Sequence, residues 1–538
     1  MLSIILTVIS GGLMVLCQPP VNMGHLCWFA LIPLFIALEG KTLKRSFLLG
    51  LLFGAVYFTG LLYWVFPILM PQTIFGGIIL IFYMSLYFAV FCLLFQYCIK
   101  PVIPLLFHES KKGDSLYAAS SEQSATQIGG HKTDAVSPLK YVLFASVLWV
   151  SLEYIRTLGP LGFPWGLFAY AQWKNVTLIQ MVDITGVYGV SFIIMLFNAA
   201  LAYIIMQYRK PSLSNTLGTP QMSVLSIILV SAIIFVFYYG MNAIGKYSLT
   251  VENKRGGIDV AIIQGNIDQN EKWDEHYLGK TLGVFYGLTR ELRTSPDLVI
   301  WPETAITLSL NENPVVRDNI LGFVKSTGSS LITGVLESEN NKYYNRAVFI
   351  SRQGEIAGKY DKIHLVPFVE AVPKFFYVIM PFLKQAVPGE DFTPGETFAV
   401  FSGPKGNFSC CVCFESIFPG HIRRFAKDGA SFLVNITNDA WFGKTSAPYH
   451  HFAINVFRAV ENRMEIARAA NSGISGFIDK TGTPAYYTKL YTRGIIRSYL
   501  TPRTNITFYT RFGDVFAFAC LIASLLFIIK LPVTRKVK

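Results

Sequence analysis

Three cysteines stand within four positions of residues 407–420, which read NFSCCVCFESIFPG. Such a cluster can form a disulfide, bind a metal ion or supply a nucleophilic thiolate. The run is strand-like, and in an extended chain Cys410 and Cys413 lie about 10 Å apart. A disulfide requires Cα atoms within roughly 7 Å of each other, so a bond between these two cysteines is disfavoured.

A metal site is disfavoured as well, because zinc needs a second pair of ligands. His450 and His451 are the nearest residues of the right type, but adjacent side chains on a helix point in different directions. We therefore expect no metal. Two interpretations of the cysteines stay open: three small residues buried in one strand, or a nucleophile at Cys413, at the end of the strand and before a turn.

Two other strand ends favour the nucleophile. Glu303 follows an apolar run in DLVIWPETA, and Lys362 follows another in GKYDKIHLVPFVEAVP. Thiol-based acyl transfer needs a general base near the thiol and a cation near the developing oxyanion. Each residue alone is commonly a solvated loop residue. Together, Glu303, Lys362 and Cys413 predict a cysteine acyl-transfer site.

The segment that carries these residues, about 246–508, alternates strand-like and helix-like runs. This alternation predicts an α/β layered domain, and about 260 residues are enough for one large core. The expected strands are 258–267, 297–303, 329–337, 344–352, 408–415 and 430–439. The expected helices are 278–294, 313–327 and 450–470.

The rest of the chain indicates a membrane protein. Of all residues 52% are hydrophobic and 15% are charged, whereas soluble domains carry about 25% charged residues. Eight apolar runs predict a bundle of eight transmembrane helices. They lie near 2–17, 26–40, 47–69, 74–98, 141–157, 188–207, 223–243 and 512–531. Residues 108–138 are polar and rich in small residues, which predicts a flexible cytoplasmic insert.

The net charge of +13 is explained by Lys and Arg beside the spans, and no nucleic-acid-binding motif is present. Placing those residues in the cytoplasm gives a multi-pass protein with both termini inside. In a bacterium the α/β domain then faces the periplasm from the inner (cytoplasmic) membrane. We expect a bundle at 1–245, the α/β domain at 246–508, and a last span with its tail at 509–538.

The motifs WPETA, YDKIHLVPFVE and CFESIFP, in that order, resemble the carbon–nitrogen hydrolase (nitrilase) superfamily with its Glu–Lys–Cys triad. Eight spans, QGNIDQNEKW and NITNDAWFG resemble the apolipoprotein N-acyltransferase family within it. The resemblance covers nearly the whole chain. It implies an αββα sandwich with Glu303 as base, Lys362 as oxyanion stabiliser and Cys413 as nucleophile, and no cofactor.

The resemblance also implies a two-step reaction. The thiolate takes the sn-1 acyl chain of a phospholipid such as phosphatidylethanolamine. The resulting thioester passes the acyl chain to the α-amino group of a diacylglyceryl-cysteine at the N-terminus of an apolipoprotein. We expect a monomer whose partners are the phospholipid donor, the diacylated acceptor and the membrane.

Further residues carry over from the family motifs. Glu370 and Glu415 match acids that would orient Lys362 or the substrate amine. Trp273 would pack against acyl chains or gate the site, and Asn438, Asp439 and Trp441 would shape the pocket. The chain departs from the family at three positions, where Val369, Phe414 and His450 replace the common Gly, Tyr and Gln.

Loops at about 370–388 and 439–449 are candidate lids. The run VPKFFYVIMPFL, 372–383, is unusually apolar for a loop and is expected to dip into the bilayer. A membrane-anchored nitrilase-type amidase is the main alternative function, since it would share the triad. A transporter or receptor is a more distant alternative. The near absence of charges within the spans disfavours a transporter, and a receptor would not need Cys413.

Overall fold

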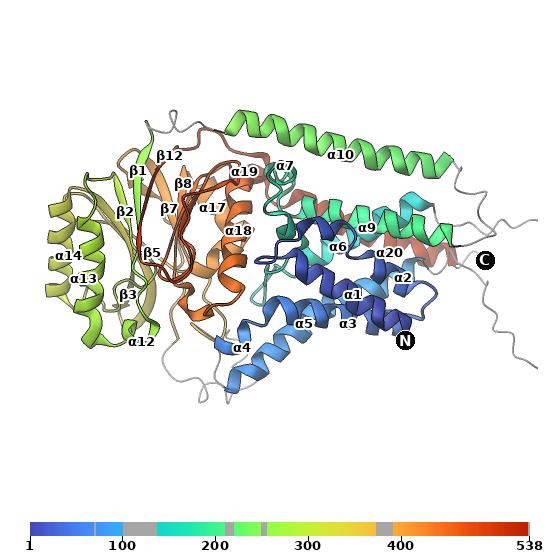
Figure 1. Cartoon of the computed structure of the whole chain (residues 1–538), viewed down its shortest axis with the longest axis horizontal. Helices are drawn as coiled ribbons and strands as arrows, with labels where there is room; N and C mark the ends of the chain where they lie inside the picture. The colour runs from blue at the N-terminus through green and yellow to red at the C-terminus, as the bar shows by residue number, and fades with distance from the viewer. Residues whose placement is uncertain (69–70, 100–136, 210–219, 249–255, 373–390, 536–538) are drawn as a thin grey trace, which may run out of the picture.

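The computed structural model describes residues 1–68, 71–99, 137–209, 220–248, 256–372 and 391–535. A helical bundle and a two-sheet domain lie side by side along the long axis of the molecule (Figure 1). The predicted insert 108–138 lies outside the described residues except for its last two positions. The predicted membrane-contacting run 372–383 lies outside them except for Val372.

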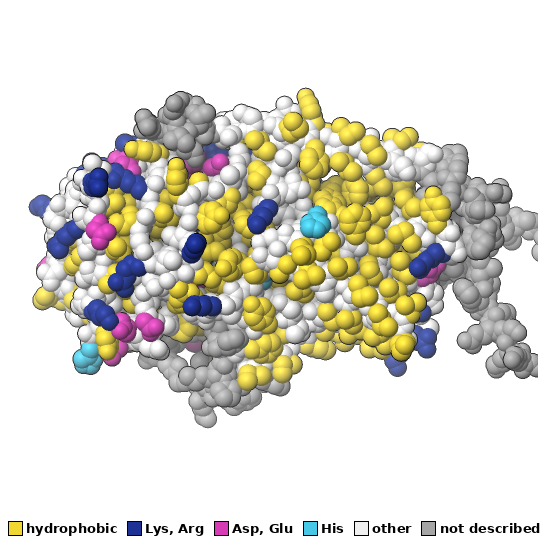
Figure 2. Space-filling model, viewed as in Figure 1, with side chains coloured by type: hydrophobic (Ala, Val, Ile, Leu, Met, Phe, Trp, Pro, Cys, Tyr) yellow, Lys and Arg dark blue, Asp and Glu magenta, His cyan; other side chains and the backbone are white. Residues whose placement is uncertain are grey.

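The bundle is built from apolar helices. They are α1 (Leu2–Cys17), α2 (Ile32–Leu38), α3 (Leu43–Leu62), α5 (Pro71–Ile99), α6 (Pro138–Ile155), α9 (Tyr188–Tyr208), α10 (Pro220–Tyr247) and α20 (Val515–Arg535). In the part of the chain that the structure describes, five helices are long and apolar enough to cross a membrane. These belong to α3, α5, α6, α9 and α10. On the face shown in Figure 2, hydrophobic side chains dominate the bundle, whereas most charged side chains lie on the two-sheet domain.

The other three predicted spans are shorter. Helix α1 and the apolar part of α20 have fewer than 18 residues. The run 26–40 is divided between a 3₁₀ helix at Gly24–Trp28 and the seven residues of α2. A membrane protein with spanning helices is therefore confirmed, and the number eight stays a prediction.

Helices α3 and α5 pack closely because glycine faces the contact. A Cβ atom on Gly50 would lie 2.4 Å from the carbonyl oxygen of Phe88. Small residues allow backbones to approach in this way where van der Waals packing drives helix association. Next to this contact the Phe88 ring stacks on Trp149, with 4.4 Å between ring centroids. The close approach and the aromatic core together fix the bundle that the second domain rests on.

The second domain contains two six-stranded sheets. The first has the order β12-β1-β2-β3-β4-β5 and the second β11-β10-β9-β8-β7-β6. The first comprises β1 (Ile258–Gln264), β2 (Leu298–Ile300), β3 (Ser330–Glu339), β4 (Lys342–Ile350), β5 (Ile356–Asp361) and β12 (Gly494–Leu500). The second comprises β6 (Phe401–Gly403), β7 (Gly406–Val412), β8 (Phe432–Thr437), β9 (Ile466–Ala470), β10 (Gly476–Ile478) and β11 (Pro484–Ala485).

Helices cover the outer faces of both sheets (Figure 1). The first sheet carries α13 (Leu278–Arg290) and α14 (Pro314–Thr327), and the second carries α17 (Pro419–Lys427) and α18 (Ala447–Asn462). Central strands such as FLVNIT in β8 are buried along their whole length, as expected for parallel strands covered on two faces. The predicted α/β layered domain is confirmed, with four layers in the order helix, sheet, sheet, helix.

The predicted helix 450–470 is wrong in its second half. Helix α18 ends at Asn462, and Arg463 takes a left-handed conformation with φ 47°. Residues 466–470 form β9, paired with β8 on one side and β10 on the other. Alanine-rich sequence favours a helix locally, but ladder hydrogen bonds to two neighbouring strands override that preference.

The predicted strand 408–415 is also too long, because β7 ends at Val412. Cys413 begins a 3₁₀ helix, η6 (Cys413–Ile417). The nucleophile candidate therefore lies immediately after the strand rather than within it. This places its side chain at the carboxyl end of the sheet.

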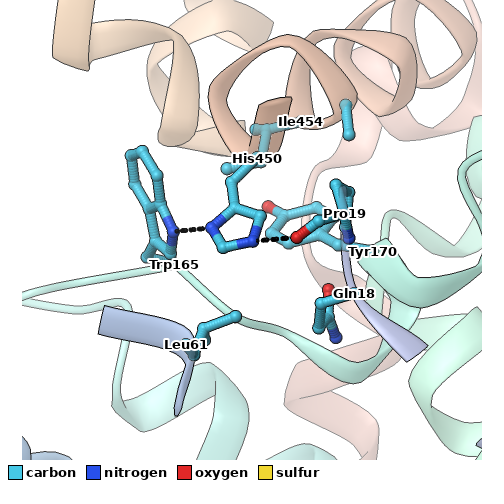
Figure 3. A pocket seen from close by; sticks show the side chains of 9 residues that line it. Gln18, Pro19, Leu61, Trp165, Tyr170, His450 and Ile454 are labelled. Atoms are coloured by element: carbon cyan, nitrogen blue, oxygen red, sulfur yellow. Dashed lines mark hydrogen bonds between the residues drawn. The ribbon is translucent and has the colours of Figure 1, made fainter. Parts of the chain in front are cut away.

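The two-sheet domain contacts the bundle through α18. His450 lies between them: its Nδ1 accepts a 3.2 Å hydrogen bond from Trp165 Nε1, and its Nε2 donates one of 2.5 Å to the Pro19 carbonyl (Figure 3). Burial lowers the pKa of His450 to about 4, so the ring is neutral. Nearby, Arg463 forms a 2.7 Å ion pair with Asp183. These buried polar contacts fix the domain on the bundle.

Candidate active site

Cys413 occupies a sharp turn at the end of β7. Its φ of 53° lies in the left-handed region. Non-glycine residues rarely adopt this conformation, and those that do are often found at functional sites. The residue is 7% exposed. Burial and the charge of Glu303 raise the pKa of the thiol, while Lys362 and a hydrogen bond from Thr437 oppose that rise. The resting thiol is therefore protonated and needs a base.

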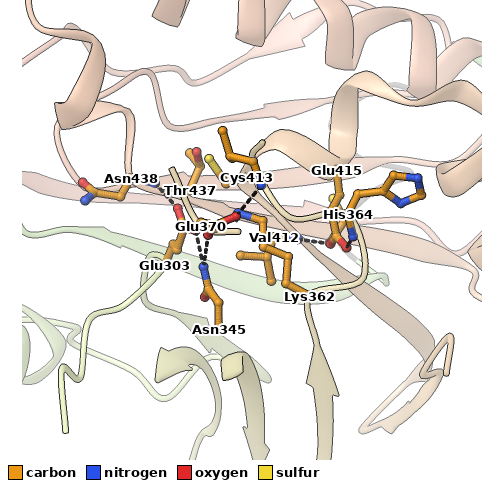
Figure 4. A network of polar contacts seen from close by, with 12 residues as sticks. Glu303, Asn345, Lys362, His364, Glu370, Val412, Cys413, Glu415, Thr437 and Asn438 are labelled. Atoms are coloured by element: carbon orange, nitrogen blue, oxygen red, sulfur yellow. Dashed lines mark hydrogen bonds and ion pairs between the residues drawn. The ribbon is translucent and has the colours of Figure 1, made fainter. Parts of the chain in front are cut away.

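Lys362 follows the last residue of β5 and is 1% exposed. Its Nζ lies 2.9 Å from Oε1 of Glu370 and 3.4 Å from Oε1 of Glu303 (Figure 4). Burial alone would lower the pKa of this lysine, but Glu370, Glu303 and Cys413 together raise it above its usual value. Lys362 therefore supplies a permanent positive charge.

Glu303 follows β2 and faces Lys362. Its Oε2 accepts a hydrogen bond of 2.8 Å from the backbone N–H of Asn438, and its Oε1 accepts one of 2.8 Å from Asn345 Nδ2. Burial raises its pKa, but Lys362 and these hydrogen bonds outweigh burial and lower it. Glu303 is thus an ionised carboxylate, available as a proton acceptor.

The backbone around Glu303 is tightly held. Thr304 adopts a φ of 46°. A Cβ atom on Gly334 of the neighbouring strand β3 would lie 2.3 Å from the Thr304 nitrogen, so only glycine fits there. The turn that presents the carboxylate is therefore fixed by the sheet beneath it.

The structure brings the three predicted residues together at the carboxyl ends of β2, β5 and β7 (Figure 4). A carboxylate, a permanent ammonium ion and a protonated thiol share one buried region. In low-dielectric surroundings an ammonium ion stabilises a developing oxyanion strongly. The arrangement can carry out nucleophilic acyl transfer at a thiol.

Asn345 is a site residue that the sequence interpretation missed. It lies within β4, and its Nδ2 donates to Glu303 and, at 2.9 Å, to Glu370. The main-chain carbonyl oxygen of Asn345 also accepts a 2.9 Å hydrogen bond from the backbone N–H of Lys362. A polar residue inside the strand-like run YNRAVFISR was the available signal, because Asn is depleted in strands.

Glu415 holds backbone rather than the lysine side chain. Its oxygens accept hydrogen bonds from the N–H groups of Val412 (2.8 Å), Ile363 (2.7 Å) and His364 (3.1 Å), and from the Tyr360 hydroxyl (2.7 Å). These donors flank Cys413 on one side and Lys362 on the other. Glu415 therefore fixes the two strand ends relative to each other. Of the two predicted supporting acids, only Glu370 has a direct ion pair with Lys362 in the described structure.

Asn438 and Asp439 face different ways. The Asn438 backbone contacts Glu303, and its side chain donates to Gln269. Asp439 pairs with Arg468 at 2.8 Å and lies 3.1 Å from His451. That ion pair holds the pKa of Asp439 well below its usual range despite burial. Asp439 thus forms part of the wall behind Cys413, whose carbonyl oxygen lies 3.1 Å from His451 Nε2.

Trp273 and Trp441 lie at the surface. Trp273 is 41% exposed and Trp441 43%, and their ring centroids are 5.8 Å apart.

In the predicted lid 439–449, the Phe442 ring contacts Trp64 of the bundle, with 5.1 Å between ring centroids. Of the positions that depart from the family pattern, Phe414 stacks on the bundle residue Phe163 and Val369 is exposed.

One group of described residues has the atom types of a metal site. It consists of His364, Glu415 and His421, whose ligand atoms lie within 4.8 Å of one another. Oε1 of Glu415 already accepts three hydrogen bonds. The carboxylate oxygen nearest the histidines therefore has little capacity left to bind a cation.

Comparison with known proteins agrees with this arrangement. Residues 10–200 match the apolipoprotein N-acyltransferase N-terminal domain, and residues 259–500 match the carbon-nitrogen hydrolase family. The apolipoprotein N-acyltransferase of Geobacter metallireducens is 35% identical over 96% of this chain and 93% of its own length. That of Thermotoga maritima is 31% identical over 97% and 92%.

Among solved structures, a Nesterenkonia AN1 amidase from the nitrilase superfamily is similar to 46% of this chain and 92% of its own, with 20% identity and a TM-score of 0.37. The two curated sequence relatives extend over both the bundle and the two-sheet domain. The chain belongs to the apolipoprotein N-acyltransferase family.

Proposed function

We propose that this protein transfers an acyl chain from a phospholipid to the N-terminal diacylglyceryl-cysteine of an apolipoprotein, through a thioester on Cys413. The observation that carries the proposal is the buried contact of Lys362 with Glu303 beside a protonated thiol. The family to which the chain belongs supports the identity of the acceptor. We further propose phosphatidylethanolamine as the donor and the sn-1 chain as the group transferred.

In the first step Glu303 takes the proton of the Cys413 thiol, and the thiolate attacks the ester carbonyl carbon of the lipid. Lys362 lies where its ammonium ion can stabilise the negative oxygen of the tetrahedral intermediate. The C–O bond then breaks, and the lysophospholipid leaves with the proton that Glu303 returns to its oxygen. Cys413 retains the acyl chain as a thioester.

In the second step the α-amino group of the acceptor attacks the thioester carbonyl. Glu303 takes one proton from the amine, as a base whose lowered pKa keeps it ionised near neutral pH. The C–S bond breaks, the new amide forms, and the thiolate recovers the proton from Glu303. Enzyme and base are restored without a cofactor.

The membrane arrangement follows the same proposal. We propose eight spans, with the bundle at 1–245, the two-sheet domain at 246–508, and the last span with its tail at 509–538. Both termini lie in the cytoplasm and the two-sheet domain faces the periplasm from the inner membrane, because Lys and Arg cluster on the opposite side. The protein acts as a monomer, and the loop at 439–449 admits the lipids; the other predicted lid, 370–388, lies outside the described residues from position 373 onward.

The test is intact-mass spectrometry of the purified full chain with phosphatidylethanolamine and no acceptor. We expect a mass gain of one fatty acyl group, removable by hydroxylamine and absent from Cys413→Ala. The matched control is Cys411→Ala, two residues earlier and within β7, and this variant should still be acylated. A diacylated lipopeptide should discharge the thioester.

An intact lipid and an unmodified Cys413 would overturn the proposal and favour a nitrilase-type amidase. That alternative predicts release of a free acid to water when an amide is supplied. The two functions therefore differ in which substrate consumes the thiol and in whether an amine discharges it.

A further inference from the structure

Lys272 is a second buried lysine near the site. It ends the short helix α12 (Gln269–Lys272) and is 4% exposed. Its Nζ donates a 2.9 Å hydrogen bond to the main-chain carbonyl oxygen of Glu303. A buried lysine is costly unless its surroundings compensate it, and lysines are almost never fully buried without a partner. This one is directed at the turn that carries the general base.

Lys272 also contributes to the charge balance of the site. Glu303 and Cys413 are the titratable groups that act on it, and both favour its charged form. In return, Lys272 lowers the pKa of Glu303. Two further charged groups act on these partners: Lys362, paired with Glu370, acts on the same Glu303, and Asp439 acts on Cys413.

We infer that Lys272 is a positioning residue for this site: its amino group holds the Glu303 turn, and its positive charge assists formation of the Cys413 thiolate. The inference rests on the proposed function only in taking Cys413 as the nucleophile. It assigns the two lysines different tasks. Lys362 faces the carboxylates and stays charged, whereas Lys272 holds the backbone of the base and can change its charge.

The charge change falls in the working range of pH. Burial lowers the pKa of Lys272 to about 7, against the opposing effects of Glu303 and Cys413. Below that pH the lysine is a cation and favours the neighbouring thiolate; above it the lysine is neutral and that assistance is lost. The reactivity of Cys413 should therefore rise by less than tenfold per pH unit near pH 7, where an isolated thiol below its pKa would rise tenfold.

The experiment measures the alkylation rate of Cys413 by iodoacetamide in the full chain in detergent, from pH 5.5 to 9.5. The modified peptide is quantified by mass spectrometry. For the wild type we expect a shoulder near pH 7. Lys272→Met should remove the shoulder and slow alkylation at pH 6 about tenfold, equivalent to a shift of one pKa unit. Lys272→Arg, with a permanent charge, should restore the rate to within about threefold, without the shoulder.

The matched control is Lys280→Met. Lys280 lies eight residues further along, is exposed and pairs with Glu271 at 2.7 Å, so its variant should follow the wild-type profile. A Lys272→Met profile equal to that of the wild type would overturn the inference. If Lys272→Met does not fold, the comparison is made between the wild type and Lys272→Arg. The inference is then overturned if the two alkylation profiles are identical and the wild type shows no shoulder.

Alkylation requires no lipid, so the two proposals fail separately. A wild type that shows the shoulder but takes no acyl chain from phospholipid would overturn the proposed function and support the role of Lys272. Acylation on Cys413 combined with unchanged alkylation of Lys272→Met would do the reverse.

Discussion

The ammonium group of Lys362 lies closer to Glu370 than to Glu303, at 2.9 Å against 3.4 Å. Glu370 therefore shares the lysine with the catalytic base candidate. A nearby cation lowers the pKa of a carboxyl group. Because Lys362 also pairs with Glu370, it lowers the pKa of Glu303 less, and Glu303 stays a stronger proton acceptor. The sharing of Lys362 is therefore one of the factors that set how basic Glu303 is.

Replacing Glu370 by Gln should slow acylation of Cys413 about tenfold, the change in proton affinity that corresponds to one pKa unit. Among the described residues Lys362 would then pair with Glu303 as its one carboxylate partner, and this stronger pairing would weaken Glu303 as a base. The rate of acyl-enzyme formation with phosphatidylethanolamine, followed by intact mass, measures the effect. Glu355→Gln, at an exposed position of the same domain, is the control. Equal rates for the two variants would contradict a role for Glu370.

Replacing Glu415 by Gln should destabilise the two-sheet domain. The wild-type carboxylate only accepts, and four donors converge on it. The amide would turn its own N–H₂ group toward one or more of those donors and leave them unsatisfied. We expect a loss of about 1–3 kcal/mol in unfolding free energy. The melting temperature in detergent measures this loss of stability. The control is Glu312→Gln at an exposed position, which should leave the melting temperature unchanged.

Stability should fall below pH 6.5 through His364 and His421, whose Nδ1 atoms lie 3.0 Å apart. Burial lowers the pKa of His421 to about 3, and for His364, whose side chain is partly exposed, partial desolvation and the neighbouring His421 lower the pKa to about 4. Both folded-state values lie below the unfolded value, so only the unfolded chain binds these protons as pH falls from about 6.5 toward 3. That binding favours unfolding.

Thermal unfolding of the full chain between pH 7 and pH 4 tests this expectation. His421→Asn should have a flatter dependence of melting temperature on pH than the wild type. His276→Asn, at a side chain that is 93% exposed, should keep the wild-type slope. A wild-type melting temperature that stays constant down to pH 4 would show that the pair does not resist protonation.

Replacing His450 should test the contact between the two parts of the molecule. His450→Ala leaves the Trp165 N–H without its acceptor and the Pro19 carbonyl without its donor, at a cost of about 1–3 kcal/mol for a buried group. His450→Gln, the residue common in the family, retains one donor and one acceptor and should be close to the wild type. Melting temperature and limited proteolysis compare the two variants. Equal stability would mean that water replaces the imidazole.

Much of the site could be predicted from the sequence because its residues follow continuous apolar strands. Glu303 follows β2 of the first sheet and Cys413 follows β7 of the second, and the two sheets pack so that these strand ends meet (Figure 4). Asn345 and Lys272 could not be found in this way. Their contacts with Glu303 depend on how β4 and α12 come to lie beside the turn that follows β2, and nothing local in the sequence specifies that arrangement.

The errors in the fold have the same origin. The run IARAA was expected to continue a helix, yet it is a central strand of the second sheet. Its Arg468 pairs with Asp439, 29 positions earlier. The burial of Arg468 can be explained only when its partner is known, and that partner lies in the turn that follows the neighbouring strand β8. Local preference decides between helix and strand only where no neighbouring strand pairs with the segment, and here β8 and β10 both pair with it.

The hydrogen bond between Pro19 and His450 joins positions 431 residues apart. A ribosome that adds about 5–20 residues each second needs roughly 20 to 90 seconds to pass from one to the other. During that interval the chain already contains the first helices of the bundle, but His450, whose imidazole binds the Pro19 carbonyl, has not yet been synthesised. The carbonyl of Pro19 therefore has no imidazole partner until α18 has been synthesised. Maturation of this end of the bundle cannot finish before that helix of the two-sheet domain is made, and completion of this one contact reports that synthesis has passed residue 450.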